Sequence, residues 1–271
     1  MTDSLQVRAV VLDWAGTVID HGSRAPMGAF VRAFARFGVE IAIADARAPM
    51  GLAKWDHIRA IGTMPSIAAA WRARHGRDFS EADVDAIFQS FEPMNIEAAR
   101  EHADLIPGAV ETIAGLRARG IKVAGTTGYT RAIMDVVAPI AAAGGYTPEF
   151  TVCAGDLPAG RPSPLMMWYA MARLGVWPVA AVVKVDDTAP GIGEGRAAGT
   201  WTVGVALTGN AAGLSAAELA TLSATDCAVL RQKASRELAG ADYIIDGLAD
   251  LPRVLEQIDA RLSVGDRPPV G

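Results

Sequence analysis

Short apolar runs alternate with amphipathic segments over most of the chain. Segments with helical spacing lie between the runs, as in 109–119, 163–174 and 248–262. Strands that alternate with helices form parallel sheets covered on both faces. The pattern therefore predicts an α/β fold with a Rossmann-like, doubly wound parallel sheet. Its strands are expected at 7–14, 121–124, 150–153, 181–185, 201–205 and 243–245.

One segment near the N-terminus interrupts this alternation. After the first strand, apolar residues recur only at helical spacing, as Phe30 and Phe34 do, until about residue 102. We therefore expect residues 1–20 and 103–271 to form an α/β core domain. Residues 21–102 are expected to form a helical cap domain inserted after its first strand.

Polar residues lie at the ends of three predicted strands, namely Asp13, Thr126, Thr127, Asp186 and Asp187. In open parallel sheets, ligands bind beyond the carboxyl ends of the strands. We therefore expect these side chains to converge at one edge of the sheet. A cap that leaves the sheet at the same edge would cover the site.

The composition is typical of a globular protein that acts on small molecules. Of 271 residues, 51% are hydrophobic and 20% are charged, which disordered chains do not show. The 25 Lys and Arg against 30 Asp and Glu give a net charge of −5, without a long basic run, so no nucleic-acid partner is expected. No apolar stretch reaches the ~18 residues of a membrane-spanning helix, so no membrane partner is expected either.

The ends and the cysteines bear on the location in the cell. The opening residues MTDSLQ include an acid and lack the basic start of an export signal. Cys153 and Cys227 have no metal-binding spacing, and two thiols in a long chain fit a reducing compartment. We therefore expect a cytoplasmic protein in which both cysteines are packing residues.

Asp13 and Asp187 are the first candidates for chemistry. An acid after a strand can be a nucleophile, a metal ligand or a cap of the next turn, and the cap is the most common role for a lone acid. Two carboxylates at one sheet edge repel each other unless a cation or a proton lies between them. A hard divalent ion such as Mg²⁺ would satisfy both, with the carbonyl of Ala15 as a further oxygen ligand.

Other residues at this edge could bind an anion. Thr127 and Gly128 offer a hydroxyl and backbone N–H groups, in what we expect to be a turn after the second core strand. Arg161, in Gly-Arg-Pro-Ser-Pro, offers a fixed positive charge. Taken alone, each of these is more often ordinary loop chemistry.

Together these residues resemble the motifs of the haloacid dehalogenase superfamily of aspartyl-phosphate enzymes. The first motif of that superfamily is usually D-x-D-x-T, in which the first Asp attacks phosphorus and the second protonates a departing oxygen. Here the motif reads Asp-Trp-Ala-Gly-Thr from Asp13, with Ala15 in place of the second acid. The missing acid indicates a leaving group that needs no protonation at oxygen.

The helical insertion carries a further candidate, Lys54. It lies near the start of an amphipathic helix, in Gly-Leu-Ala-Lys-Trp-Asp-His, and a lone lysine there is most simply a solvated one. If the cap closes Lys54 over the core site, however, apolar walls and neighbouring cations would lower its pKa. The free amine could then attack a carbonyl and form a Schiff base.

With Ala15 and Lys54 together, the sequence resembles the phosphonatase family of this superfamily. The motifs D-W-A-G-T, G-L-x-K-x-D-H, T-T-G-Y-T, G-R-P-x-P and V-K-V-D-D-T all have counterparts in the chain. The resemblance implies a small-molecule phosphonate as substrate, phosphonoacetaldehyde. Its C–P bond would be hydrolysed through a Schiff base on Lys54 and an aspartyl phosphate on Asp13.

The resemblance also implies further roles. Mg²⁺, Thr127 with Gly128, and Arg161 would hold the phosphoryl oxygens. Met50, His57 and Tyr129 are candidates for proton handling or packing around the Schiff base, although His57 could equally be an interior group with only structural contacts. The family resemblance further implies a homodimer formed through the cap helices.

Two rival functions stay open. The first is a hydrolase of the same superfamily that cleaves a C–halogen bond, which would need neither a cap lysine nor a metal. The second is a catalytically idle module that binds phosphate or a partner. Such a module would have no use for an intact Asp13.

Two details qualify the resemblance. Some family members carry another Asp four residues after the acid at the position of Asp187, where this chain has Gly191. Asp186 could replace that acid near the metal or could cap the following helix. Separately, the segment from Gly193 to Ala198 fits the dinucleotide fingerprint G-x-G-x-x-A, but its glycines fall inside a helical pattern, so no dinucleotide site is expected.

Overall fold

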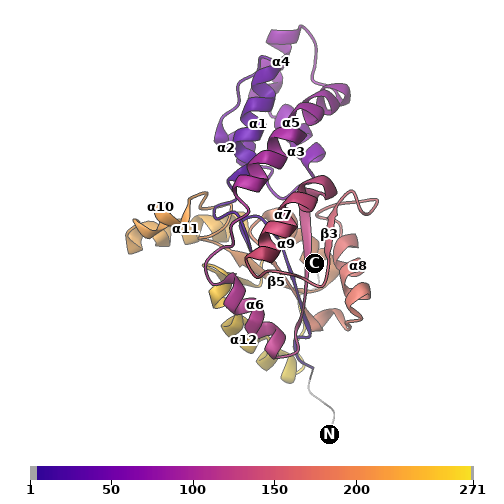
Figure 1. The fold of residues 1–271 in the computed structure, drawn as a ribbon, viewed down its shortest axis with the longest axis vertical. Coiled ribbons are helices and arrows are strands. Elements are labelled where there is room, and N and C mark those ends of the chain that lie inside the picture. The colour runs from indigo at the N-terminus through magenta and orange to yellow at the C-terminus, as the bar shows by residue number, and fades with distance from the viewer. Residues whose placement is uncertain (1–4, 270–271) are drawn as a thin grey trace.

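A computed structural model describes residues 5–269, and Figure 1 shows its arrangement. Six strands form one sheet in the order β3-β2-β1-β4-β5-β6, and all neighbouring strands are parallel. The predicted α/β fold with a Rossmann-like, doubly wound sheet is therefore confirmed. The strands are β1 (Ala9–Leu12), β2 (Lys122–Thr130), β3 (Thr151–Ala154), β4 (Val182–Asp186), β5 (Trp201–Val205) and β6 (Tyr243–Ile245).

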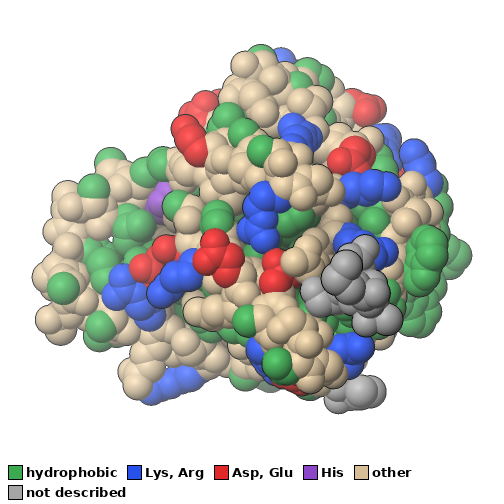
Figure 2. Space-filling model, turned by 90° about the horizontal axis from the view of Figure 1, so that it is seen from below, with side chains coloured by type: hydrophobic (Ala, Val, Ile, Leu, Met, Phe, Trp, Pro, Cys, Tyr) green, Lys and Arg blue, Asp and Glu red, His purple; other side chains and the backbone are tan. Residues whose placement is uncertain are grey.

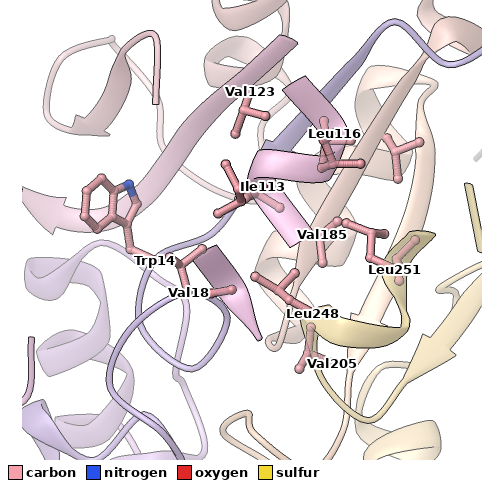
Figure 3. Packing of buried hydrophobic residues seen from close by; sticks show 14 of the residues in the cluster. Trp14, Val18, Ile113, Leu116, Val123, Val185, Val205, Leu248 and Leu251 are labelled. Carbon is pink, nitrogen blue, oxygen red and sulfur yellow. The ribbon is translucent and has the colours of Figure 1, made fainter. Parts of the chain in front are cut away.

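Helices cover both faces of the sheet. Successive strand residues point to opposite faces, so Val10 and Leu12 pack into one hydrophobic cluster and Ala9 and Val11 into another. Figure 3 shows part of the first cluster, where Ile113 approaches Val18 and Val123. The first face is covered by α6 (Ala109–Ala118), α7 (Arg131–Ala143) and α12 (Leu251–Ser263), and the second by α8 (Leu165–Leu174) and α9 (Ala189–Ala198).

The second strand differs from the sequence prediction. We expected a strand that ends at Ala124 and a turn at Thr127 and Gly128, but β2 continues to Thr130. Its pairing with β3 shifts register between Thr127 and Thr130, which is a local irregularity within the strand. Gly-Thr-Thr-Gly resembles a turn in composition, but pairing with β3 keeps this segment extended.

The segment between β1 and α6 is helical, and its helices extend beyond the sheet in Figure 1. They share a hydrophobic cluster of their own, which includes Phe30, Phe34 and Phe91. Ser80 precedes the longest helix and donates to the Asp83 carboxylate from both its N–H and its hydroxyl, and the N–H contact is the one that a capping box uses. The helices are α1 (Ala25–Arg36), α2 (Ile43–Arg47), α3 (Lys54–Gly62), α4 (Pro65–His75) and α5 (Glu81–Glu101).

The remaining elements are two helices and two short 3₁₀ turns. Two helices, α10 (Ala216–Ala220) and α11 (Ala224–Glu237), project to one side of the sheet in Figure 1. Short 3₁₀ turns, η1 (Val179–Ala181) and η2 (Leu248–Asp250), precede β4 and α12.

The outer surface carries charges of both signs. On the face seen in Figure 2, Lys and Arg side chains lie interspersed with Asp and Glu. Within the described residues, no helix has both the length and the apolar character needed to cross a membrane. The first four residues, on which the expected lack of an export signal partly rests, lie outside the described residues.

Candidate active site

Three carboxylates lie together at the carboxyl edge of the sheet, where β1 and β4 are neighbours. Asp13 directly follows β1, Asp186 is the last residue of β4, and Asp187 comes next. Their oxygens lie within 4.8 Å of one another, and none of the three residues is more than 5% exposed. The strand order changes direction at this point, which is where open sheets bind ligands.

The loop after β1 passes directly over Asp187. Gly16 has a φ of +82°, and a Cβ there would lie 2.1 Å from Asp187 Oδ2, so only glycine fits. The Asp187 carboxylate also accepts hydrogen bonds from the N–H of Asn210 at 2.7 Å and from the hydroxyl of Thr17 at 3.3 Å. These contacts fix the Asp187 carboxylate beside the end of β1.

Arg161 reaches this edge from the loop before α8. Its Nη2 lies 2.7 Å from Asp13 Oδ1, and its Nη1 lies 3.3 Å from Asp186 Oδ2. Nη2 also donates to the carbonyl oxygen of Thr126 at 2.6 Å. The buried guanidinium thus places its donors beside Asp13, where a bound oxyanion could also accept from them.

The sequence analysis did not single out two further buried charges, Lys184 of β4 and Glu194 of α9. Lys184 Nζ lies 3.0 Å from Asp186 Oδ2 and 3.2 Å from Glu194 Oε2, and all three side chains are fully buried. A charged side chain is seldom buried unless it is paired. A lysine inside the strand-like run Val-Val-Lys-Val and a glutamate among apolar helical residues were therefore the signals for this pair.

We call six buried charged residues at this edge the floor of the site. Four carboxylates and two cations give it a formal charge of −2. Burial and repulsion from Asp186 raise the pKa of Asp13 to about 6, and burial and repulsion from Asp13 raise the pKa of Asp187 well above its usual value. A divalent cation would neutralise the excess charge, so the oxygens present fit a hard metal ion. The floor consists of Asp13, Asp186, Asp187, Glu194, Arg161 and Lys184.

The structure also explains Gly191. A Cβ at this position would lie 1.9 Å from Asp186 Oδ2, so the Asp186 carboxylate fills the space that a side chain at 191 would need. Asp186 accepts hydrogen bonds from the N–H and the hydroxyl of Thr188, at 3.0 and 2.7 Å. Thr188, and not Asp186, is the N-cap of α9. Asp186 therefore belongs to the carboxylate cluster and orients the residue that caps the helix.

Lys54 is the first residue of α3 and is only 3% exposed. Helical side chains lean toward the N-terminus of their helix, so the amine extends beyond the start of α3. The loop before α3 lies against the core, because a Cβ at Gly51, whose φ is +95°, would lie 2.2 Å from Thr188 Oγ1. As a result, Lys54 and Asp13 line the same cavity.

The amine of Lys54 has mainly apolar and aromatic neighbours. Nζ lies 3.9 Å from Met50 Sδ, 5.7 Å from the ring centroid of Phe30 and 5.3 Å from that of Tyr129. None of the ion pairs found within residues 5–269 includes Lys54. Burial lowers the pKa of Lys54 to about 8, although the charge of Asp13 opposes this shift.

His57 lies one turn along α3 from Lys54, outside the lining of the cavity. Its Nε2 lies 2.7 Å from the carbonyl oxygen of Ala46, so Nε2 must carry the hydrogen. Its ring stacks on Phe30 at 4.1 Å, and Nδ1 has no partner among the described residues. Burial and the nearby Lys54 charge lower the pKa of His57 well below its usual value, so the imidazole is neutral.

Tyr129 forms another wall of the cavity, with its ring toward Lys54. Its hydroxyl is buried and has no hydrogen-bond partner in the described part of the chain. Burial and the nearby acids Asp20 and Asp13 raise the pKa of Tyr129 well above its usual value. The hydroxyl therefore stays protonated and can serve only as a neutral group toward a bound molecule.

One small cavity brings most of the predicted residues together. Its volume is only about 20 Å³, and its lining comes from both the helical segment and the core. Four further residues that the sequence analysis did not predict complete the lining, namely Ser23, Pro26, Gly51 and Thr188. The predicted residues in the lining are Asp13, Ala15, Met50, Lys54, Thr127, Gly128, Tyr129 and Arg161.

A second cavity shares the lining residues Met50 and Thr188 with the first and is also lined by Arg47 and Asp187. Arg47, at the end of α2, connects the helical segment to the core. Its Nη1 donates to the carbonyl oxygen of Gly22 and to Asn210 Oδ1, both at 2.9 Å. Because the N–H of Asn210 donates to Asp187, one residue links α2 to the carboxylate cluster.

The dinucleotide-like segment lies inside a helix. Gly193 and Gly195 are both residues of α9, as the helical pattern predicted. A Cβ at Gly195 would lie 2.7 Å from Lys184 Cβ, so this glycine allows α9 to approach β4. Its role is therefore close helix–strand packing.

Comparison with known proteins is consistent with this geometry. A family model for haloacid dehalogenase-like hydrolases matches residues 7–199. Phosphonoacetaldehyde hydrolase of Paraburkholderia phytofirmans is 48% identical over 264 residues, which cover 97% of this chain and 99% of the relative. The Salmonella typhimurium protein of the same name is 49% identical over 267 residues, with 97% and 99% covered.

Solved structures show the same fold. A crystal structure of a phosphonoacetaldehyde hydrolase-like protein from Oleispira antarctica has a TM-score of 0.96 and 42% identity, and covers 98% of this chain and 97% of its own. A β-phosphoglucomutase from Clostridium difficile has a TM-score of 0.70 at 15% identity, over 96% of this chain and 100% of its own, and shows the fold alone.

The fold and the site define a class of hydrolases that have an aspartate directly after the first strand and a pair of acids at the end of the fourth. The chain belongs to the haloacid dehalogenase-like hydrolases and, within them, to the phosphonoacetaldehyde hydrolase family.

Proposed function

We propose that this enzyme hydrolyses the C–P bond of phosphonoacetaldehyde to acetaldehyde and phosphate. The single observation that carries the proposal is the placement of a buried amine, Lys54, and a buried carboxylate, Asp13, in the lining of one small cavity. The names of relatives that are 47–49% identical over nearly the full chain support the same substrate.

In the first step, the Lys54 amine attacks the aldehyde carbon, and loss of water gives an iminium ion. The step needs a neutral amine. With a pKa near 8, roughly a quarter of Lys54 is neutral at pH 7.5, against about one in a thousand for an ordinary lysine. Met50 and Tyr129 contact Nζ and pack around the iminium, with His57 behind them as a neutral group.

In the second step, an oxygen of Asp13 attacks phosphorus and forms an aspartyl phosphate. The electron pair of the C–P bond passes into the iminium and gives an enamine, which then takes a proton from water at carbon. No oxygen departs, so the step needs no general acid next to Asp13. This accounts for Ala15 at the position where the superfamily usually has its second acid.

Three groups would hold the phosphoryl oxygens during this transfer. The guanidinium of Arg161 lies beside Asp13, and Thr127 and Gly128 line the same cavity with a hydroxyl and a backbone N–H. Donors fixed before the reaction stabilise charge without having to reorganise, which is the main contribution a protein makes to phosphoryl transfer.

We further propose that the resident metal ion is Mg²⁺. The residues that would hold it are Asp13 and Asp187 through their carboxylates and Ala15 through its carbonyl, with Asp186 beside them. When bound, the ion would neutralise the excess negative charge of the floor and of the phosphoryl group.

Hydrolysis of the two covalent intermediates restores the enzyme. Water attacks the aspartyl phosphate and releases phosphate from Asp13. The enamine, once protonated, is an iminium that takes up water and releases acetaldehyde from Lys54. The water lost in the first step is returned here, so the net reaction consumes one water per substrate.

The rivals left open by the sequence gain no specific support. A dehalogenase has no use for a buried lysine across from its nucleophile, and an idle module has no use for the charge arrangement around Asp13.

The test is an assay of the purified enzyme with phosphonoacetaldehyde and Mg²⁺ for both products. We expect phosphate and acetaldehyde in equal amounts, and no chloride release from 2-chloro acids. Chloride release without phosphate would support the dehalogenase, and no turnover of either substrate would support the idle module.

Two coarser proposals have separate support. The two cysteines of the chain support a cytoplasmic location, and the family resemblance supports a homodimer formed through the helical segment. Light scattering of the purified protein tests the second one, and a monomer at working concentration would remove it.

A further inference from the structure

The buried pair of Lys184 and Glu194 has no part in the chemistry proposed above, although it directly contacts Arg161 and Asp186 of the site. Glu194 Oε2 accepts from three donors: Thr126 Oγ1 at 3.0 Å, Arg161 Nε at 3.1 Å and Lys184 Nζ at 3.2 Å. Lys184 Nζ in turn donates to Thr126 Oγ1 at 2.7 Å. One carboxylate oxygen therefore holds together two strands, β2 and β4, the helix α9 and the loop that carries Arg161.

Stability alone does not explain such a pair. Removing two charges from water costs free energy that their attraction often fails to recover, and a well-packed apolar pair is frequently as stable. Both side chains are completely buried. The pair therefore has to be explained by what it does to its neighbours.

The neighbour most affected is Arg161. A guanidinium is planar, so a contact that fixes Nε also fixes the directions in which both Nη groups donate. Glu194 fixes Nε, and the carbonyl of Thr126 accepts from Nη2 at 2.6 Å. The remaining donor directions of Nη1 and Nη2 then point to Asp186 and Asp13.

We propose that Glu194, held in place by Lys184, is a positioning residue that sets the orientation of Arg161 toward the oxyanion bound at Asp13. The expected effect on turnover rests on the proposed function. The expected effect on anion binding does not. Glu194 does not line the cavity, so it acts through Arg161 and not on the substrate.

A double-mutant cycle tests this coupling. Glu194→Gln keeps the shape of the side chain and removes its charge, and we expect kcat/KM to fall roughly 10- to 100-fold, because a small misplacement of a catalytic donor has effects of that size. Arg161→Lys has no planar fork to orient. Adding Glu194→Gln to Arg161→Lys should therefore cost less than about threefold further.

A matched control separates positioning from general damage. Asp242 also accepts two hydrogen bonds, from the N–H and the hydroxyl of Thr202, and lies at the far side of the sheet near β6. Asp242→Asn should leave kcat/KM unchanged. If Glu194→Gln does not fold by circular dichroism, Glu194→Asp, which keeps the charge on a shorter stem, takes its place in the cycle, with the same expected pattern.

A binding measurement distinguishes failure of this inference from failure of the proposed function. Calorimetric titration of orthophosphate, in the presence of Mg²⁺, should show about tenfold weaker binding for Glu194→Gln and no further weakening when Arg161→Lys is already present. Equal losses in both backgrounds, or an unchanged affinity and kcat/KM in Glu194→Gln, would overturn the positioning role. An enzyme that does not cleave phosphonoacetaldehyde but shows the coupled loss of phosphate binding would keep it.

Discussion

Two of the four lysines in this chain, Lys54 and Lys184, are buried near Asp13 and have opposite surroundings. Lys184 Nζ has two carboxylates within 3.2 Å. Lys54 Nζ has a thioether and two aromatic rings. Lys184 belongs to the floor of the site, whereas Lys54 comes from the helical segment above it.

The two lysines show how one protein can use one buried lysine in ion pairs and another as a candidate nucleophile. A buried ammonium surrounded by carboxylates is stabilised in its charged form, whereas one surrounded by apolar groups is stabilised by losing its proton. In the proposed mechanism, the helical segment supplies the amine nucleophile. The floor supplies the carboxylate nucleophile, Asp13, together with the charges that hold an anion.

The largest effect is expected from a substitution that keeps the positive charge of Lys54 and removes its nucleophilicity. Lys54→Arg should lower kcat by about 10³-fold or more, because guanidinium stays protonated and cannot form an imine. Phosphate release measures the effect. Lys122→Arg is the matched control, since Lys122 donates to the carbonyl of Leu174 at the opposite end of the sheet and should retain full activity. A Lys54→Arg variant with substantial turnover would contradict amine catalysis.

Removing the divalent ion should have the next largest effect. The floor carries four carboxylates against two cations, so it should need an added positive charge to bind a phosphoryl group. Chelation is expected to lower turnover roughly 10²-fold or more, and added Mg²⁺ should restore it. The melting temperature should also fall on chelation. Full activity and an unchanged melting temperature after exhaustive chelation would show that the floor needs no ion.

The pH dependence of imine formation tests whether the surroundings of Lys54 lower its pKa. Only the neutral amine reacts, so the rate should rise with pH and level off above the pKa of about 8. Between pH 6 and pH 8 the neutral fraction rises about 50-fold, whereas a lysine of ordinary pKa would show no plateau until beyond pH 10. Trapping with acetaldehyde and borohydride isolates this step, because it involves no phosphorus. A rate that still rises tenfold per unit at pH 9 would place the amine in an ordinary environment.

The smallest effect concerns the connection between the two parts. Arg47 joins α2 to the core through the carbonyl of Gly22 and the side chain of Asn210. Arg47→Met should raise KM up to about tenfold with little change in kcat, because two or three hydrogen bonds that favour closure are lost. Steady-state kinetics measure both constants. A fall in kcat with an unchanged KM would mean that Arg47 acts on the chemistry instead.

Much of the fold could be predicted from sequence, for a clear reason. Buried parallel strands are short apolar runs, and alternation with amphipathic helices leaves few topologies open. The continuation of β2 through Thr130 could not be predicted, because Gly-Thr-Thr-Gly has the composition of a turn and only pairing with β3 keeps it extended.

The candidate site was predictable where its residues follow strands and less so elsewhere. Asp13 and Asp187 come directly after apolar runs, so topology alone brings them together. Lys184 lies within a strand and Glu194 within a helix. The sequence indicates that both side chains are buried, but it does not indicate which residues they contact. The reach of Lys54 to the cavity depends on how the helical segment closes, which no local pattern encodes.

Chemical trapping is the most direct test of whether Lys54 forms a covalent imine with the substrate. Borohydride added during turnover of phosphonoacetaldehyde should inactivate the enzyme, and mass spectrometry of its peptides should find an ethyl adduct on Lys54. Because the chain has only three other lysines, Lys122, Lys184 and Lys233, every competing side chain can be examined in the same digest. An adduct confined to Lys54 is the predicted result, and full activity after borohydride with no modification of Lys54 would contradict the account.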